Sequence, residues 1–141
     1  MHPVVRSSLA VIAGIVVAVV IVAAIETGAH AIYPAPAGVD LADPEQARQY
    51  MQSIPLGALL LVFTGWTCGA FGGAMVAALI ARARPMFHAG LVGAVVLAAA
   101  AANLAALPHP AWFAILGVAG ICVGAFAGGK VLSMKAAPGA Q

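Results

Sequence analysis

Four long apolar runs, separated by short polar segments, constrain what this chain can fold into. They cover approximately residues 8–33, 55–81, 86–107 and 111–130. Each run is close to the ~20 residues that an α-helix needs to cross the hydrocarbon core of a bilayer at about 1.5 Å per residue. The sequence therefore predicts an all-α membrane protein, in which residues 1–141 form a single integral domain with four transmembrane helices.

The composition favours the same class. Hydrophobic residues make up 64% of the chain and charged residues 7%, whereas soluble domains have roughly 25% charged residues. The basic residues are too few and too scattered to form a nucleic-acid surface. Ala29-His30-Ala31 has the form of a signal-peptidase site, but the first run is longer than the ~7–15 residues of a signal core. We therefore expect this run to remain as a span.

The connections between the runs indicate how the helices are paired. Pro108-His109-Pro110 is so short that the last two spans must form an antiparallel hairpin, and the first two form another. In the segment that joins the first two, Asp43 is placed as a helix N-cap and Gln46 to close a capping box. Apolar residues then share one face, which predicts a short amphipathic helix over about 44–52 on the membrane surface: Ala47, Tyr50, Met51 and Ile54.

Two glycine ladders lie within the second and fourth runs. Each has three glycines spaced four residues apart: Gly65, Gly69, Gly73, Gly120, Gly124 and Gly128. Glycines at this spacing form one stripe of a helix and allow a second helix to approach closely. We therefore expect the bundle to be closed along two seams. The two ladders follow a proline at the same distance, which either an internal duplication or similar packing requirements would produce.

Charge is distributed unevenly between the two ends of the predicted bundle. One end holds five of the six basic residues: Arg6, Arg82, Arg84, Lys130 and Lys135. The other end holds Arg48 and the acidic residues of the connecting segment: Asp40, Asp43 and Glu45. The positive-inside rule then predicts that both termini are cytoplasmic.

Glu26 is the one acidic residue within a predicted span. An ionisable group there marks a candidate functional site, although an interfacial or paired carboxylate would have no such role. His30 follows one turn later on the same face, and Asn103 and His109 reach the same level from the last hairpin. These four residues could form a polar cluster that relays protons or cations. Glu26, His30 and His109 could instead bind a metal ion, although no cysteine joins them and we expect no cofactor.

Trp66 lies near the middle of the second span, between Thr64 and Thr67. A tryptophan at this depth is away from the membrane interface and its N–H needs a partner, whereas the threonine hydroxyls can bond to carbonyls one turn back. These three residues could line a substrate pocket or pack in a helix interface. The sequence has no P-loop, no G-x-S-x-G and no H-E-x-x-H motif, and we expect no catalytic activity.

A series of short motifs resembles a group of small uncharacterised bacterial inner-membrane proteins with four spans: Arg6, Glu26-Thr-Gly-Ala-His30, Tyr33-Pro34-x-Pro36-x-Gly38, Ile54-Pro55, Gly65-Trp66 and Pro108-His109-Pro110-x-Trp112. The resemblance covers most of the chain and implies four spans in a bacterial inner membrane, with no activity attached. The small multidrug resistance transporters are similar in size, span number and an acid on the first helix. Their acid lies near the middle of the membrane, whereas Glu26 is displaced outward.

Two functions from different classes fit this sequence, and both have the lipid bilayer as a partner. The ladders favour a non-catalytic protein that assembles as a homo-oligomer or within a larger membrane complex, because the chain is too small to bury both seams and also enclose a large site. Glu26 favours a small proton- or cation-coupled transporter, with His30, Asn103 and Trp66 along its path.

Overall fold

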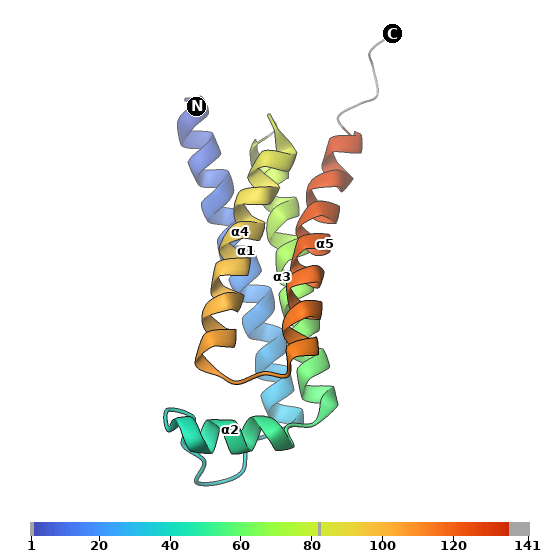
Figure 1. The fold of residues 1–141 in the computed structure, drawn as a ribbon. Helices are drawn as coiled ribbons and strands as arrows, with labels where there is room; N and C mark the ends of the chain where they lie inside the picture. The colour runs from blue at the N-terminus through green and yellow to red at the C-terminus, as the bar shows by residue number, and fades with distance from the viewer. Residues whose placement is uncertain (1, 82, 136–141) are drawn as a thin grey trace.

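The computed structural model describes residues 2–81 and 83–135, and these residues form helices and short connections (Figure 1). The four long helices are α1 (Pro3–Ile32), α3 (Leu56–Ala81), α4 (Pro85–Ala106) and α5 (Ala111–Lys135). They run side by side in alternating directions, and each is long and apolar enough to span a membrane. The short helix α2 (Pro44–Ser53) lies between α1 and α3 in the chain. The predicted fold class is therefore confirmed.

The charge separation predicted between the two ends follows from this topology. α1 and α4 begin, and α3 and α5 end, at the end of the bundle where both termini lie (Figure 1). We name this the basic end, because Arg6, Arg84 and Lys130 lie on its helix termini. Lys135 is the last residue of α5, and Arg82 lies outside the described residues. The opposite end is the α2 end.

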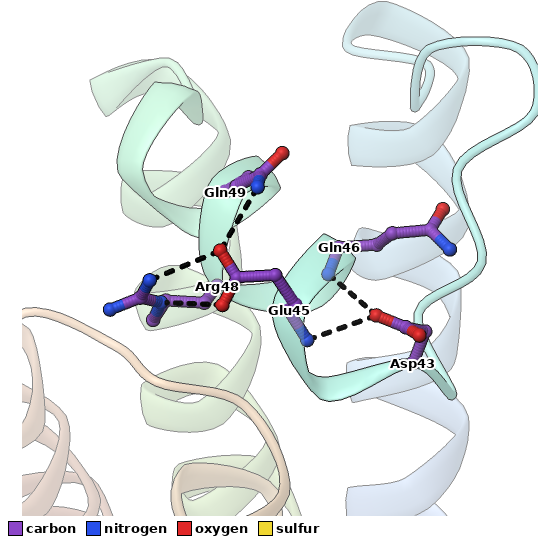
Figure 2. A network of polar contacts seen from close by, with 5 residues as sticks. All are labelled: Asp43, Glu45, Gln46, Arg48 and Gln49. Carbon is purple, nitrogen blue, oxygen red and sulfur yellow. Dashed lines mark hydrogen bonds and ion pairs between the residues drawn. The ribbon is translucent and has the colours of Figure 1, made fainter.

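Helix α2 begins where the sequence predicts, at a cap formed by Asp43. One carboxylate oxygen of Asp43 accepts hydrogen bonds from the backbone N–H groups of Glu45 at 3.0 Å and Gln46 at 2.9 Å (Figure 2). The predicted capping box does not form, because the Gln46 side chain accepts from the backbone N–H of Asp40 at 3.0 Å instead. Hydrogen bonds from Arg48 and Gln49 lower the pKa of the Glu45 carboxyl, and this exposed pair is a solvated surface contact.

The apolar face of α2 packs on the protein. Ala47 and Met51 are buried, and Met51 belongs to the same core cluster as Leu59 and Phe113. Tyr50 packs against this cluster from the same helix. Helix α2 therefore covers the α2 end of the bundle, and its amphipathic pattern is explained by burial within the chain.

The first glycine ladder packs against α1. A β-carbon on Gly73 would lie 2.5 Å from the carbonyl oxygen of Gly14, and one on Gly14 would lie 2.6 Å from that of Gly73. At Gly69 a β-carbon would lie 3.0 Å from the carbonyl oxygen of Ala18. Gly65 is different, because a β-carbon there would meet Ile25 at an ordinary 3.5 Å. The tight seam is thus formed at Gly69 and Gly73, and Gly65 is not required for it.

The second glycine ladder packs against a different face of α3. A β-carbon on Gly124 would lie 2.5 Å from the carbonyl oxygen of Thr67, and one on Gly128 would overlap the carbonyl oxygen of Phe71. One on Gly120 would overlap the Thr67 hydroxyl. Helix α3 therefore holds α1 on one face and α5 on another at backbone contact. Both seams are filled within a single chain, as expected for a bundle closed along the two ladders.

The two threonines of α3 are not equivalent. The Thr64 hydroxyl donates to the carbonyl oxygen of Leu60 at 2.7 Å, one turn back, as expected for a threonine in a helix. The Thr67 hydroxyl oxygen is buried in the α3–α5 seam, and it has no hydrogen-bond partner within the described ranges 2–81 and 83–135. A buried hydroxyl without a partner costs free energy.

We predict that Gly73→Ala lowers the free energy of unfolding by about 1–3 kcal/mol, because its methyl group would overlap the Gly14 carbonyl oxygen. Gly65→Ala is the matched control in the same ladder, and we expect it to be neutral or stabilising by up to about 1 kcal/mol. Unfolding by SDS titration in mixed micelles, followed by circular dichroism, measures both. An equal loss of stability in the two variants would contradict the seam described above.

We also predict that Thr67→Val raises the free energy of unfolding by about 1 kcal/mol or more, because valine has the same shape without the unpaired hydroxyl. Thr64→Val, which removes a hydroxyl with a partner on an exposed position, serves as the control and should change stability little. The same SDS titration applies. A loss of stability in Thr67→Val would contradict this prediction, because it would show that the Thr67 hydroxyl has a hydrogen-bond partner when the protein is in a membrane.

Candidate ligand-binding groove

Helices α1 and α4 contact each other at one level and leave a groove beyond it. They meet where a β-carbon on Gly14 would lie 2.9 Å from a methyl group of Val92. From this contact toward the α2 end, a groove of about 310 Å³ lies between them. The α1 wall includes residues from Ile15 to Glu26, and the α4 wall includes residues from Val95 to Asn103. Trp66 of α3 lies at the back of the groove.

Small side chains create this groove. Ala18 and Ala23 line it on α1, and Ala99 and Ala100 line it on α4, so neither helix has a large side chain that fills the space. On the rim, Val19 is 60% exposed and Val95 is 42% exposed. Because both valines lie within spanning helices, the groove opens sideways toward lipid rather than through the ends of the bundle.

Two polar side chains lie at the same level of this apolar groove. Helices α1 and α4 run in the same direction, so Glu26 and Asn103 both lie about 17 Å beyond the Gly14–Val92 contact by helical rise. Glu26 is half-buried and Asn103 is exposed. Among the residues that the structure describes, neither the carboxylate nor the side-chain amide has a hydrogen-bond or ion-pair partner. Both groups are therefore available to a ligand.

The other two members of the predicted polar cluster have partners elsewhere. The Nδ1 of His30 lies 2.7 Å from the backbone carbonyl oxygen of Glu26, and its ring is exposed. The Nδ1 of His109 lies 2.9 Å from the carbonyl oxygen of Leu107. The His109 ring stacks on Phe113 with centroids 5.0 Å apart and an interplanar angle of 15°. Local backbone acceptors and an aromatic ring hold these two imidazoles, and the groove lining includes neither of them.

This placement also bears on the metal site considered from the sequence. Within residues 2–81 and 83–135, no group of three or more His, Cys, Asp or Glu side chains is arranged to hold a metal ion. Glu26, His30 and His109 therefore do not converge on a common point. The i to i+4 spacing of Glu26 and His30 places both on one face of α1, but the imidazole turns to the backbone carbonyl.

Trp66 lines the groove, whereas the two threonines considered with it do not. The Trp66 ring is 4% exposed and packs against Phe113 with centroids 5.4 Å apart. Thr64 is exposed on another face of α3, and Thr67 packs against Gly120 of α5. The three residues therefore do not form one pocket. Trp66 serves both as packing for α5 and as the back wall of the groove.

Sequence reasoning missed the alanines that shape the groove. Ala18 and Ala23 on one span and Ala99 and Ala100 on another are unremarkable in a chain so rich in alanine. They matter only because α1 and α4 are neighbours in the same direction, which no pattern in a single sequence shows. For Ala18 the sequence contains one weak indication. Ala10, Gly14 and Ala18 form a stripe of small residues on one face of α1, and all three are buried.

No family model, curated protein or solved structure matches the chain. The resemblance noted in the sequence therefore extends as far as the number of spans, without a family. Four helices are long and apolar enough to cross a bilayer, and their outer faces are apolar. The chain is a small integral membrane protein with several spans, and these are in contact with lipid.

Proposed function

We propose that this protein binds an amphipathic cation in the groove between α1 and α4, with Glu26 as the counter-charge and without a catalytic step. The observation on which this rests is a half-buried carboxylate that has no partner among the described residues and lines an apolar groove. Such binding is the first step that a small cation-coupled transporter requires.

The chemistry of the groove favours this class of ligand over others. An ionised carboxylate beside an apolar surface is poorly solvated, so a bound cation at that position is stabilised by a charge-assisted interaction. The Asn103 amide can accept a hydrogen bond from the same ligand. The ring of Trp66 lies at the back of the groove and adds a surface that cations favour. The apolar walls then receive the apolar part of the ligand.

The size and position of the groove further limit which ligands can bind there. At about 310 Å³ the groove is at the lower limit of ordinary small-molecule sites, so the ligand is a compact amphiphile. Because the exposed rim at Val19 and Val95 lies within spanning helices, the ligand enters from the bilayer. The basic end supports a cytoplasmic location of both termini in a bacterial inner membrane, which places Glu26 toward the outer leaflet.

We predict that Glu26→Gln weakens binding of tetraphenylphosphonium, a compact lipophilic cation, by about ten- to a hundredfold, because the electrostatic attraction between the carboxylate and the cation is lost. In a Trp112→Phe background, Trp66 is the remaining tryptophan and its fluorescence reports occupancy of the groove. The titration uses purified protein in lipid nanodiscs.

Two variants complete this test. Ala99→Phe fills the groove and should abolish binding while Glu26 is retained. Glu45→Gln removes an exposed carboxylate at the α2 end and should leave binding unchanged. Binding by Glu26→Gln with the affinity of the parent protein would rule out the groove carboxylate as the counter-charge.

Self-association is a second candidate function, and α4 supports it better than the ladders do. Both ladders are filled within the chain, so neither is open to a second copy. Helix α4 instead presents an exposed stripe of small residues at a spacing of four: Gly90, Ala94, Ala98 and Ala102. A β-carbon on Gly90 would meet nothing within 4 Å, and Gly90 and Ala94 border a hollow of about 280 Å³ between α4 and α5. A helix of a second copy or of a larger membrane complex could approach there.

We predict that Ala94→Leu reduces crosslinking between copies in native membranes at least severalfold, because a bulky side chain blocks close approach at the stripe. Ala119→Leu places the same side chain on the exposed face of α5 and serves as the control. The measurement is the ratio of dimer to monomer after treatment with an amine- or carboxyl-reactive crosslinker. A strictly monomeric parent protein would remove self-association as a function.

A further inference from the structure

We propose that the basic end contains a separate site for the headgroup of an anionic phospholipid, between the N-terminal parts of α1 and α4. A hollow of about 510 Å³ lies there, on the other side of the Gly14–Val92 contact from the Glu26 groove. Its polar lining is Ser7, Ser8, Arg84 and His88. The site does not depend on the function proposed for the groove.

The distribution of acidic residues leaves this end without a counter-charge from the chain. The chain has four acidic residues, and all of them lie between positions 26 and 45, which belong to the far half of α1 and to the α2 end: Glu26, Asp40, Asp43 and Glu45. In the described part of the chain, Arg84 has no ion-pair partner. An anion from outside the protein can therefore pair with Arg84 at the basic end.

Arg84 is held in an unusual backbone conformation at the edge of the hollow. Its φ of 49° and ψ of 55° are left-handed, a region in which arginine is uncommon and which costs on the order of 1–2 kcal/mol. The strain is maintained because Pro85 begins α4 directly afterwards and the Arg84 carbonyl oxygen accepts from the backbone N–H of Phe87 at 3.0 Å. This geometry fixes the backbone from which the Arg84 side chain extends, and Arg84 is one of the residues that line the hollow.

His88 is the second polar group whose geometry indicates a ligand. It is only 6% exposed, and its Nδ1 lies 3.1 Å from the Arg84 carbonyl oxygen, which can only accept. Nδ1 therefore holds the proton, and Nε2 has no hydrogen-bond partner within the described residues. Since His88 lines the hollow, Nε2 can accept a hydrogen bond from a headgroup hydroxyl.

The other features of the hollow distinguish a phospholipid from a free phosphate. The N-terminus of α4 lies at the hollow, so its helix dipole favours an anion there, and the hydroxyls of Ser7 and Ser8 can donate to it. The hollow continues along an apolar wall formed by Val11, Ile12, Phe87 and Leu91. Phe87 is 60% exposed and Leu91 39%, so this wall is open to an acyl chain. Basic hollows between spanning helices are typical headgroup sites.

The test uses the purified full-length protein in neutral detergent, titrated with short-chain phosphatidylglycerol, short-chain phosphatidylcholine or inorganic phosphate. The readout is the temperature of unfolding. We expect phosphatidylglycerol to raise the temperature of unfolding by several degrees at saturation, because it binds the folded state and not the unfolded state. We expect phosphatidylcholine and inorganic phosphate to leave this temperature nearly unchanged. An equal effect of phosphatidylcholine would overturn the anionic site, and an equal effect of inorganic phosphate would show binding of the ion without the lipid.

Variants locate the effect. Arg84→Asn keeps a residue suited to the left-handed conformation but removes the charge, and we expect at least about a fivefold loss of apparent affinity for phosphatidylglycerol. Arg84→Lys keeps the positive charge and should keep most of the affinity of the parent protein for phosphatidylglycerol. Arg48→Gln removes an arginine at the α2 end and should have no effect. If Arg84→Asn alters the fold, His88→Gln provides an independent loss of affinity. Unchanged phosphatidylglycerol affinity in either folded variant would overturn the proposal.

Discussion

Backbone contact of α3 with α1 and α5 is the interaction on which the rest of this structure depends. In a bilayer the tails of lipids are as apolar as leucine, so helices are held together by close packing rather than by exclusion from water. Gly73 meets Gly14 of α1, and Gly124 meets the backbone of Thr67, on two faces of α3. Side chains between these backbones would separate the helices. Close packing therefore explains why the core of the bundle is mostly alanine and glycine.

Helix α4 packs on α1 less extensively than on α3 and α5, and both hollows lie between α1 and α4. Helix α4 touches α1 at Val92, where Gly14 has no side chain to hold the helices apart. On the α2 side of that contact the space is bordered by Glu26, and on the basic side it is bordered by Arg84. One pair of neighbouring helices thus forms two cavities of opposite charge. Their different charge reflects the grouping of all acidic residues between positions 26 and 45.

Much of the fold could be predicted from the sequence because its signals are local. The length of each apolar run fixes the spans, and Asp43 followed by Pro44 fixes the start of α2 through hydrogen bonds two and three residues away. Which face each ladder packs against is not local. Gly65 shares the spacing of Gly69 and Gly73, yet α1 has diverged enough at Ile25 that a methyl group fits there. Spacing shows that glycines share a stripe, but only the partner helix decides which of them are required.

For the candidate site, too, the sequence predicts only some of the residues. A charged residue in a span is costly wherever it lies, so Glu26 could be identified from the sequence, and Asn103 could be placed at the same level by counting residues. The positions of the two imidazoles could not be predicted from the sequence, because an imidazole can bond to any of several acceptors within reach. His30 is satisfied by the carbonyl of its own helix, and His109 by its loop and the ring of Phe113. Glu26 and Asn103 differ because the alanines around them offer no acceptor or donor, so within the described residues both side chains stay without a hydrogen-bond partner.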